Sequence, residues 1–314
     1  MNDNYFSSLI KETPPPLSFE NQTTISKSKI LLINLNTTLT HLAKVLILKG
    51  FNLYILDKTL ITQNDINANY YLKQSDLNTN KAKTISSFLS HLTAVASITI
   101  ITDITQAKDA KVACVGFQHF YELRSYEEYF TRKGIYFYCI NTSGIYGFSY
   151  NNICINNKGK FCVDNILFSR KRDICLDNVK RKENVFKNNK ACLEIAIYLI
   201  DLFYIKNVDK KNIKKEIEQS DDYNMFQKKM FFIENFLNTN NIIINNKNKE
   251  MLMDVIKKLL TNFNKEFAPI CIMMSKYISE QIFSILLSLS KPQCGLYTYD
   301  SESDNYDYIS FLDN

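Results

Sequence analysis

Short apolar runs alternate along the chain with longer segments in which apolar residues recur every three or four positions. The run Ile30–Leu35 is apolar almost throughout, as expected of a strand buried on both faces of a sheet. Thr40–Lys49 has the apolar spacing of a helix, and Gly50 follows where a helix C-cap belongs. Leu53–Leu56 predicts a second strand, which ends at Asp57. This stretch therefore predicts a βαβ unit.

The same alternation continues for about a hundred residues beyond this unit. Helical spacing predicts helices at Lys81–Ala94 and Ser125–Lys133. Short apolar runs predict strands at Ser97–Thr102, Val112–Gly116 and Tyr136–Ile140, and a hairpin made of Tyr146–Cys154 and Phe161–Phe168. Alternating strands and helices at this spacing predict an α/β fold with a doubly wound, mostly parallel sheet.

The pattern divides the chain into four parts. Residues 1–24 are expected to form a flexible tail, and residues 25–168 a Rossmann-like α/β part. Residues 169–265 are charged at first and then helical with long Asn- and Lys-rich connections, so we expect a helical insertion. Residues 266–314 are expected to complete the α/β domain, with a helix at Ala268–Leu289 and a strand at Gly295–Tyr299.

Bulk composition adds little to this picture. The 314 residues are 46% hydrophobic, enough for one large core, and the net charge of +6 is weak support for a nucleic-acid partner. None of the eight cysteines forms a CxxC pair, so we expect no zinc site and instead reduced, buried thiols in an intracellular protein. The N-terminus lacks the apolar core of a signal peptide, and charged residues interrupt the longest apolar tracts. We therefore expect no membrane span.

The turn after the first strand is the unusual feature. A nucleotide-binding GxGxxG turn needs glycine for the tight bend, for phosphate approach and for close helix packing. Here the six positions run from Asn34 to Leu39 and contain no glycine, and Thr37 is β-branched where phosphate would approach. Thr37 or Thr38 could cap the helix instead. Two interpretations stay open: a Rossmann-like unit kept for packing, or a site for an unusual ligand.

Four segments resemble one known family. They are ILLINLNTTLTHLAK, the following LITQNDINANYYL, then EFAPICIMMSKYISEQIFSILL, and finally GLYTYDS. Their order and spacing resemble the ubiquitin-like-modifier activating enzymes of the ThiF-like superfamily, over residues 26–150 and 266–301. The resemblance implies an adenylation-type Rossmann-like fold.

The functional residues of that family are mostly missing. The resemblance places its three loop glycines at Asn34, Thr37 and Leu39, its phosphate-binding arginine at Ala68, and its metal-binding aspartate near Gln118. Its ribose-binding acid falls on Asp57 and its lysine on Lys81, and these two are present. Taken alone, Asp57 is equally a loop cap and Lys81 a solvated helix residue. Nothing at these positions neutralises a triphosphate with Mg²⁺.

This pattern of loss resembles the inactive member of the heterodimeric activating enzymes. The resemblance implies a non-catalytic subunit of a SUMO-type activating enzyme, with the stretch CINTSGIYGFSYNNI closest to that type. It implies that ATP and Mg²⁺ bind in the catalytic partner subunit, and that this chain binds no cofactor or metal. It further implies a nuclear location, with the cytoplasm as alternative, and only indirect contact with the modifier. A Nedd/Rub-type regulatory subunit, a free-standing divergent ThiF-like adenylating enzyme and a nicotinamide-dependent enzyme are the rivals.

Three further features have two interpretations each. Asn69, Tyr70 and Tyr71 suit a partner interface, or ordinary packing beneath a loop. The basic stretches SRKRD and VKRKE suit a nuclear import signal or contact with an acidic partner, or a solvated connection. Cys139 has no nearby histidine in the sequence, which favours a buried thiol over a nucleophile. The family's N-terminal arginine is missing, and Lys11 is the nearest basic residue.

Overall fold

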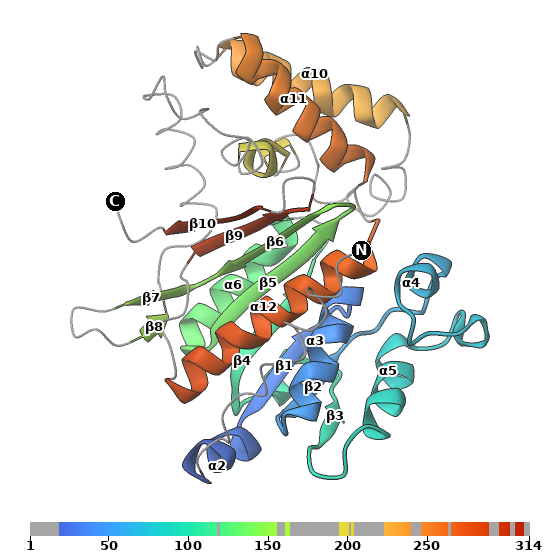
Figure 1. Cartoon of the computed structure of the whole chain (residues 1–314), viewed down its shortest axis with the longest axis vertical. Coiled ribbons are helices and arrows are strands. Elements are labelled where there is room, and N and C mark those ends of the chain that lie inside the picture. Colours follow the sequence, from blue (N-terminus) through green and yellow to red (C-terminus); the bar gives the residue numbers. More distant parts are fainter. Residues whose placement is uncertain are drawn as a thin grey trace, which may run out of the picture.

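A computed structural model describes residues 19–117, 120–155, 161–163, 195–200, 202–203, 223–239, 246–262, 265–288, 295–301 and 305–310. The described residues form one mixed eight-stranded sheet with helices on both faces (Figure 1). The strand order is β10-β9-β6-β5-β4-β1-β2-β3. The strands are β1 (Lys29–Ile33), β2 (Asn52–Leu56), β3 (Ile98–Ile100), β4 (Ala110–Gly116), β5 (Tyr136–Ser143), β6 (Tyr146–Asn151), β9 (Gly295–Asp300) and β10 (Asn305–Ser310).

Strands β1 to β5 run parallel, in the order expected of a Rossmann-like half, whereas β6, β9 and β10 are joined by antiparallel pairing. The helices are α2 (Phe19–Lys27), α3 (Thr37–Leu48), α4 (Gln63–Ala68), α5 (Lys81–Ser90), α6 (Phe120–Lys133), α10 (Tyr223–Thr239), α11 (Asn246–Thr261) and α12 (Ala268–Leu287). Short 3₁₀ turns occupy Gln74–Asp76 and Ile104–Gln106. The predicted α/β, doubly wound, Rossmann-like fold is thus confirmed.

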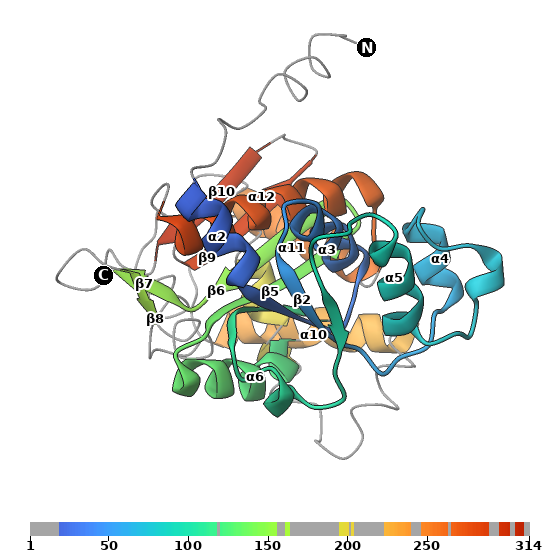
Figure 2. The same cartoon turned by 90° about the horizontal axis from the view of Figure 1, so that it is seen from below.

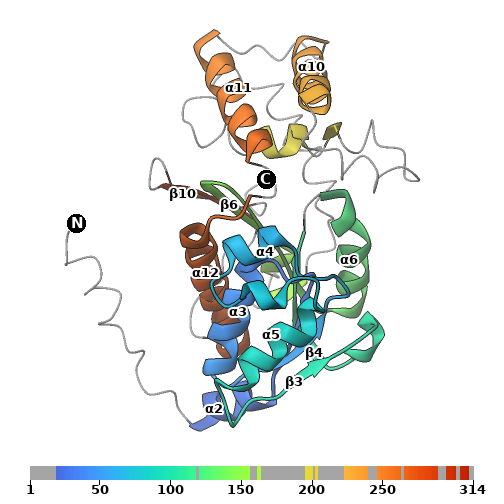
Figure 3. The ribbon, with the colours of Figure 1, turned by 90° about the vertical axis from the view of Figure 1, so that its right-hand side faces the viewer.

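The central strands are mostly apolar because most of their residues are buried on both faces of the sheet. In β1, Ile30 and Leu32 belong to one core cluster, whereas Leu31 and Ile33 belong to the other. The first cluster packs under α3, α5 and α12, and the second under α6 and the α10–α11 pair. Figures 2 and 3 show α6 on the opposite side of the sheet from α3 and α12, and Figure 3 shows α10 and α11 beyond one end of the sheet.

Three predicted boundaries need correction. The predicted tail at 1–24 extends too far, because α2 begins at Phe19 and buries Ile25; residues 1–18 lie outside the described residues. The predicted hairpin is wrong in its first strand: β6 pairs with β5 and β9. Only Ile153–Ile155 (β7) pairs with Phe161–Val163 (β8), in a separate ribbon. Strand β10, which the sequence pattern did not predict, pairs with β9.

Helices α10 and α11 lie where a helical insertion was predicted, although much of 169–265 falls outside the described residues. Within the described residues, α12 is the one helix long and apolar enough to cross a membrane, judged by length and composition. Ile278 and Ile282 of this helix are fully buried in the protein's own core, beside α3.

Candidate functional site

The glycine-free turn lies at the topological switch point of the sheet. From β1 the chain moves to β2 on one side, and after β3 it returns to β4 on the other side of β1. In open α/β sheets, ligands bind beyond the carboxyl ends of the strands at this point. Residues 34–36 connect β1 to α3 at that position, so they are the first place to look for a site.

The turn obtains without glycine the backbone conformation that glycine supplies elsewhere. Asn34 has φ +54°, in the left-handed region that Asn tolerates better than most residues, and its N–H donates to the Leu56 carbonyl at 3.1 Å. Leu35 is buried, with its N–H donating to the Asp57 carboxylate at 2.7 Å. The loop is therefore held by β2 and the acidic residue that follows it.

Asn36 caps α3 and ties the loop across the switch point. Its Oδ1 accepts from the Leu39 N–H at 2.8 Å, as an N-cap residue should. Its Nδ2 donates to the Ile140 carbonyl of β5 at 3.2 Å. Asn36, rather than Thr37 or Thr38, is therefore the N-cap of α3. Leu39 is fully buried in the core under α3, so it does not face the phosphate position.

Gly116, the last residue of β4, packs directly against this loop. A Cβ built on it would lie 2.2 Å from the Asn34 carbonyl oxygen and 3.1 Å from the Asn36 side chain. Such distances are far inside van der Waals contact, so only glycine allows β4 and the loop to approach this closely. The protein's own backbone thus closes the space between β1 and β4.

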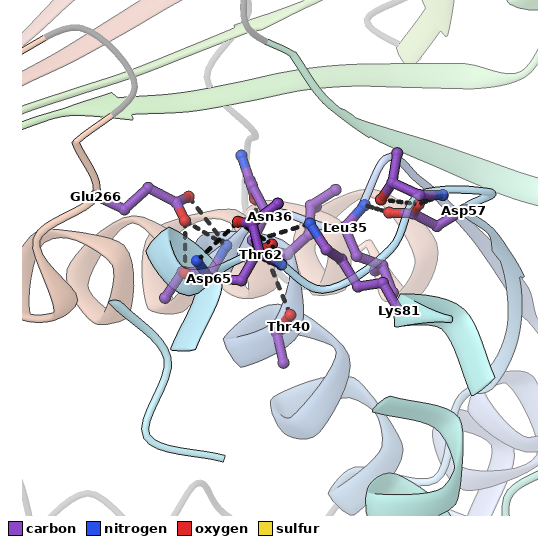
Figure 4. Close-up of polar contacts among 11 residues, drawn as sticks. Leu35, Asn36, Thr40, Asp57, Thr62, Asp65, Lys81 and Glu266 are labelled. Carbon is purple, nitrogen blue, oxygen red and sulfur yellow. Dashed lines mark hydrogen bonds and ion pairs between the residues drawn. The ribbon is translucent and has the colours of Figure 1, made fainter. Parts of the chain in front are cut away.

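The first turn of α3 already holds an anion, which is the side chain of Glu266. Its carboxylate accepts from the Thr37 N–H at 3.0 and 3.1 Å and from the Thr37 Oγ–H at 2.6 Å (Figure 4). These donors are the free groups with which a helix N-terminus binds phosphate. Glu266, 229 residues away in the sequence, takes the place that a nucleotide phosphate would need.

The charged form of the Glu266 carboxylate is disfavoured at this position. The residue as a whole is partly exposed, but its carboxylate is enclosed, and this desolvation raises its pKa above the ordinary value. The hydrogen bonds from Thr37 work in the opposite direction and favour the charged form. Asp65 raises the pKa of Glu266 further, whereas Lys81 lowers it, which places all three groups in one electrostatic cluster.

Lys81 is engaged with a protein carboxylate. Its Nζ lies 2.7 Å from Asp65 Oδ1, and the two side chains are only 12% and 16% exposed. The interpretation of Lys81 as a solvated helix residue is therefore wrong. Asp65 also completes the capping box of α4, in which its carboxylate accepts from the N–H of the N-cap residue Thr62. The lysine that the family resemblance places at Lys81 is thus paired here with an internal carboxylate.

Asp57 is buried and almost fully used by the loop. One oxygen accepts from the Leu35 N–H, and the other from the Thr59 N–H at 2.8 Å and the Thr59 Oγ–H at 2.6 Å. A carboxylate offers about four acceptor positions, so three are taken. Asp57 braces the turn, as the loop-cap interpretation predicts.

The predicted interface residues form an aromatic cluster with His41. Tyr70 is 63% exposed, and its hydroxyl shares a 2.5 Å hydrogen bond with that of Tyr71, which contacts His41 Nδ1 at 3.2 Å. Lys44 Nζ lies 5.1 Å from the centroid of the Tyr71 ring. Burial, and secondly Lys44, lowers the pKa of His41 to about 4. Asn69 is buried and accepts from the Tyr71 N–H, so of the three predicted residues Tyr70 is the most exposed.

The other candidates are placed as follows. Cys139 is buried in β5, and burial raises its pKa well above the ordinary value, which makes it a poor nucleophile. Ala68 ends α4. Gln118, Lys11 and the two basic stretches lie outside the described residues. Among the residues that the structure does describe, no three His, Cys, Asp or Glu side chains gather as metal ligands would.

Fold and site together define a Rossmann-like α/β protein whose anion position at the first turn of α3 is filled from within. Among solved structures, the chain is similar to E. coli MccB (TM-score 0.55), to MccB with MccA-N7isoASN (0.55) and to MccB with AMPCPP and selenomethionine MccA (0.53). Each match has 11% identity, covers 93–94% of this chain and spans about two thirds (65–67%) of the MccB chain. This likeness establishes the fold. No protein-family model and no curated protein sequence matches the chain.

Sequence analysis missed two residues that define this site. Asn36 stands directly before an apolar helical run, which is an N-cap signature, and it could have been found from that position. Glu266 lies just before Phe267, the N-cap of the apolar helix α12, but its partner Thr37 lies near the other end of the chain. No local pattern connects the two, so only the folded chain reveals their contact.

Proposed function

We propose that this chain is the non-catalytic subunit of a heterodimeric ubiquitin-like-modifier activating enzyme, of the SUMO type. The observation that carries the proposal is the Glu266 carboxylate bound at the first turn of α3. A Rossmann-like body that fills its own phosphate position is suited to support a partner's site rather than to bind ATP itself.

Electrostatics around the loop supports the same conclusion. Asp57, Asp65 and Glu266 contribute three carboxylates within this small region, and Lys81 contributes one ammonium, already paired. A triphosphate would have to displace Glu266 and approach the remaining carboxylates without a neutralising cation of its own. In this proposal ATP and Mg²⁺ therefore bind in the catalytic partner, and this chain takes no cofactor.

The partner subunit is proposed to dock over the aromatic cluster that contains Tyr70. A stiff, exposed tyrosine that is already held by neighbouring rings loses little entropy on binding, which is typical of interface anchors. We expect an interface above ~2,000 Å², as in obligate pairs. A nuclear location, or a cytoplasmic one, follows only from the proposed role in modifier activation.

Two measurements test this function. The purified chain should catalyse no ATP–pyrophosphate exchange, and it should co-purify with one of the catalytic subunits when each is co-expressed with it. A pull-down against SUMO-type and Nedd/Rub-type catalytic subunits decides between those two modifiers. A stable monomer that ignores every catalytic subunit would refute the proposal.

One alternative has an observation in its favour. The fold is that of MccB, one structure of which contains AMPCPP, so a free-standing divergent adenylating enzyme is the second candidate. It would require Glu266 to leave the first turn of α3 before nucleotide binds. Exchange activity in the isolated chain, abolished by changes at Thr37, would favour this candidate over the first.

A further inference from the structure

Strand β3 forms an open edge of the sheet. Within the described residues it pairs with β2 alone, and it is the outermost strand on that side, beside α5 (Figure 1). The bonds to β2 include those of the Ser97 carbonyl, which accepts at 2.9 Å, and of the Ile101 N–H, which donates at 2.9 Å. Because the backbone groups of a strand alternate in direction, the N–H and C=O groups of Ile98 and Ile100 point away from β2.

Polar side chains hold both ends of β3 in place. At its start, Asn52 Oδ1 accepts from the Ser97 N–H at 2.9 Å and from the Ser97 Oγ–H at 2.8 Å. Just beyond its end, Gln106 Oε1 accepts from the Thr102 N–H at 2.8 Å. The edge is therefore ordered before any partner reaches it, so pairing with it costs little further conformational entropy.

The sequence of this edge lacks most of the features that keep edge strands apart. Residues 92–102 include no charged residue and no proline, and the pairing of β3 with β2 contains no bulge. Thr99 is exposed, and Ile100 is 41% exposed although it is apolar. The protective feature that remains is the short length of the strand, which is three residues.

The absence of charge favours a second copy of this chain as the occupant of the edge. When a strand pairs with its own copy across a twofold axis, the central side chain meets its own counterpart, so a charged side chain there would meet a like charge. Strand β3 presents only isoleucine and threonine, which are β-branched and suit cross-strand pairs. The edge is thus complementary to itself in charge and in side-chain type.

We propose that β3 is a self-association edge: two copies of the chain pair their β3 strands antiparallel, so that two eight-stranded sheets join across a twofold axis. Ile98 of one copy exchanges both main-chain hydrogen bonds with Ile100 of the other, which uses the outward-pointing groups of the strand. Thr99 then faces its own counterpart, with the two Cα atoms ~4.5 Å apart. The inference does not depend on pairing with a catalytic subunit.

Sedimentation equilibrium of the purified full chain, from ~10 µM to ~1 mM, measures this association. Because a strand of three residues buries little area, we expect a dissociation constant of about 0.1 mM. Assembly should stop at the dimer, since a twofold contact is closed. Thr99→Lys places two ammonium groups opposite each other and should weaken the dimer ~fivefold or more. Ser87→Lys, on the exposed side of α5, is the matched control and should associate as the wild type does.

Two results of this measurement would overturn the proposal. Equal association of Thr99→Lys and the wild type, or assembly beyond the dimer, would place the contact on another surface. A wild-type chain that stays monomeric throughout would leave the edge to an extended segment of another protein.

A disulfide trap tests the register of the pairing. Thr99→Cys should form a cross-linked dimer in oxidised glutathione, because a Cα separation of ~4.5 Å lies within the range that a disulfide spans. The wild type and Ser87→Cys, which share the native cysteines, should cross-link several-fold less. The trap works on the chain alone or in complex with a catalytic subunit, so its failure is separate from failure of the proposed function. Cross-linking of Thr99→Cys no greater than that of Ser87→Cys would refute the pairing.

Discussion

Two opposite influences act on the carboxylate of Glu266. Thr37 donates two hydrogen bonds to it, which favour the charged form, whereas desolvation and the neighbouring Asp65 favour the protonated form. The net result is a raised pKa. A group whose pKa is raised on folding binds its proton more tightly in the folded state, so it contributes stability at low pH.

The raised pKa of Glu266 gives a prediction for the variant Glu266→Gln. In the wild type, the contribution of Glu266 is fully present below the ordinary carboxyl pKa and is lost as pH rises through the raised value. Glutamine keeps an acceptor for the Thr37 N–H but does not titrate. The variant should therefore gain stability relative to the wild type as pH rises above the ordinary carboxyl pKa, measured as the difference in urea midpoints at each pH. Glu234→Gln, on an exposed face of α10, is the matched control.

Asp57 carries a separate residue-scale prediction. Asp57→Ala leaves the buried Leu35 N–H and two donors of Thr59 without their acceptor. An unmet buried donor costs about 1–3 kcal/mol, so we expect a loss of ~2–3 kcal/mol in the free energy of unfolding. Asp254→Ala breaks only an exposed ion pair with Lys258 and should cost under ~1 kcal/mol. Equal losses in the two variants would show that Asp57 does not brace the loop.

The sequence predicted part of this site and not the rest, for a physical reason. Asp57 was placed at the end of a predicted strand, and the family resemblance placed both Asp57 and Lys81 at the site. The state of Lys81 could not be predicted, since its partner Asp65 lies on a different helix. Glu266 is further still, and its contact with Thr37 exists only after the sheet has formed.

At the scale of elements, predictability follows burial. Strands β1, β2, β4 and β5 were predicted because burial on both faces makes them apolar throughout, or nearly so. Helix α2 is polar and buries little beyond Ile25, so the sequence pattern predicted a flexible tail there and not a helix. Strand β10 alternates tyrosines with polar residues at the sheet edge. Strand β6 pairs with β9, which lies about 145 residues further along the chain, and this long-range pairing of β6 with β9 leaves no local signal in the sequence.

Packing between β4 and the loop gives an element-scale prediction. Gly116→Ala places a Cβ 2.2 Å from a backbone carbonyl, which cannot rotate away, so it should cost ~3 kcal/mol or more and disturb the loop. Gly147→Ala is the matched strand variant, because its Cβ would meet the flexible side chain of Met274 at 2.6 Å. Met adapts, so this change should cost distinctly less. Urea unfolding of the two variants compares them, and an equal cost would mean that the loop yields easily.

At the scale of the whole molecule, the described residues divide into a closed site and an exposed aromatic surface. The switch point is closed by Gly116, Asn36 and Glu266 acting from three different parts of the chain. Beside His41 of α3, by contrast, Tyr70 is left 63% exposed although its ring contacts those of Tyr71 and His41. This exposed ring is the surface on which the proposed catalytic partner would dock.

The final prediction concerns that surface. Tyr70→Ala removes a mostly exposed ring, so it should change the free energy of unfolding by under ~1 kcal/mol. It should nevertheless weaken binding of a catalytic subunit at least tenfold, because the loss of an interface anchor costs ~1.4–2 kcal/mol of binding free energy. Val95→Ala is the control, because Val95 is 84% exposed and has no ring contacts. Co-expression pull-down followed by titration of the purified subunits measures both variants. If Tyr70→Ala and Val95→Ala bind the partner equally well, the aromatic cluster is packing beneath a loop, and the docking surface must be sought on another face.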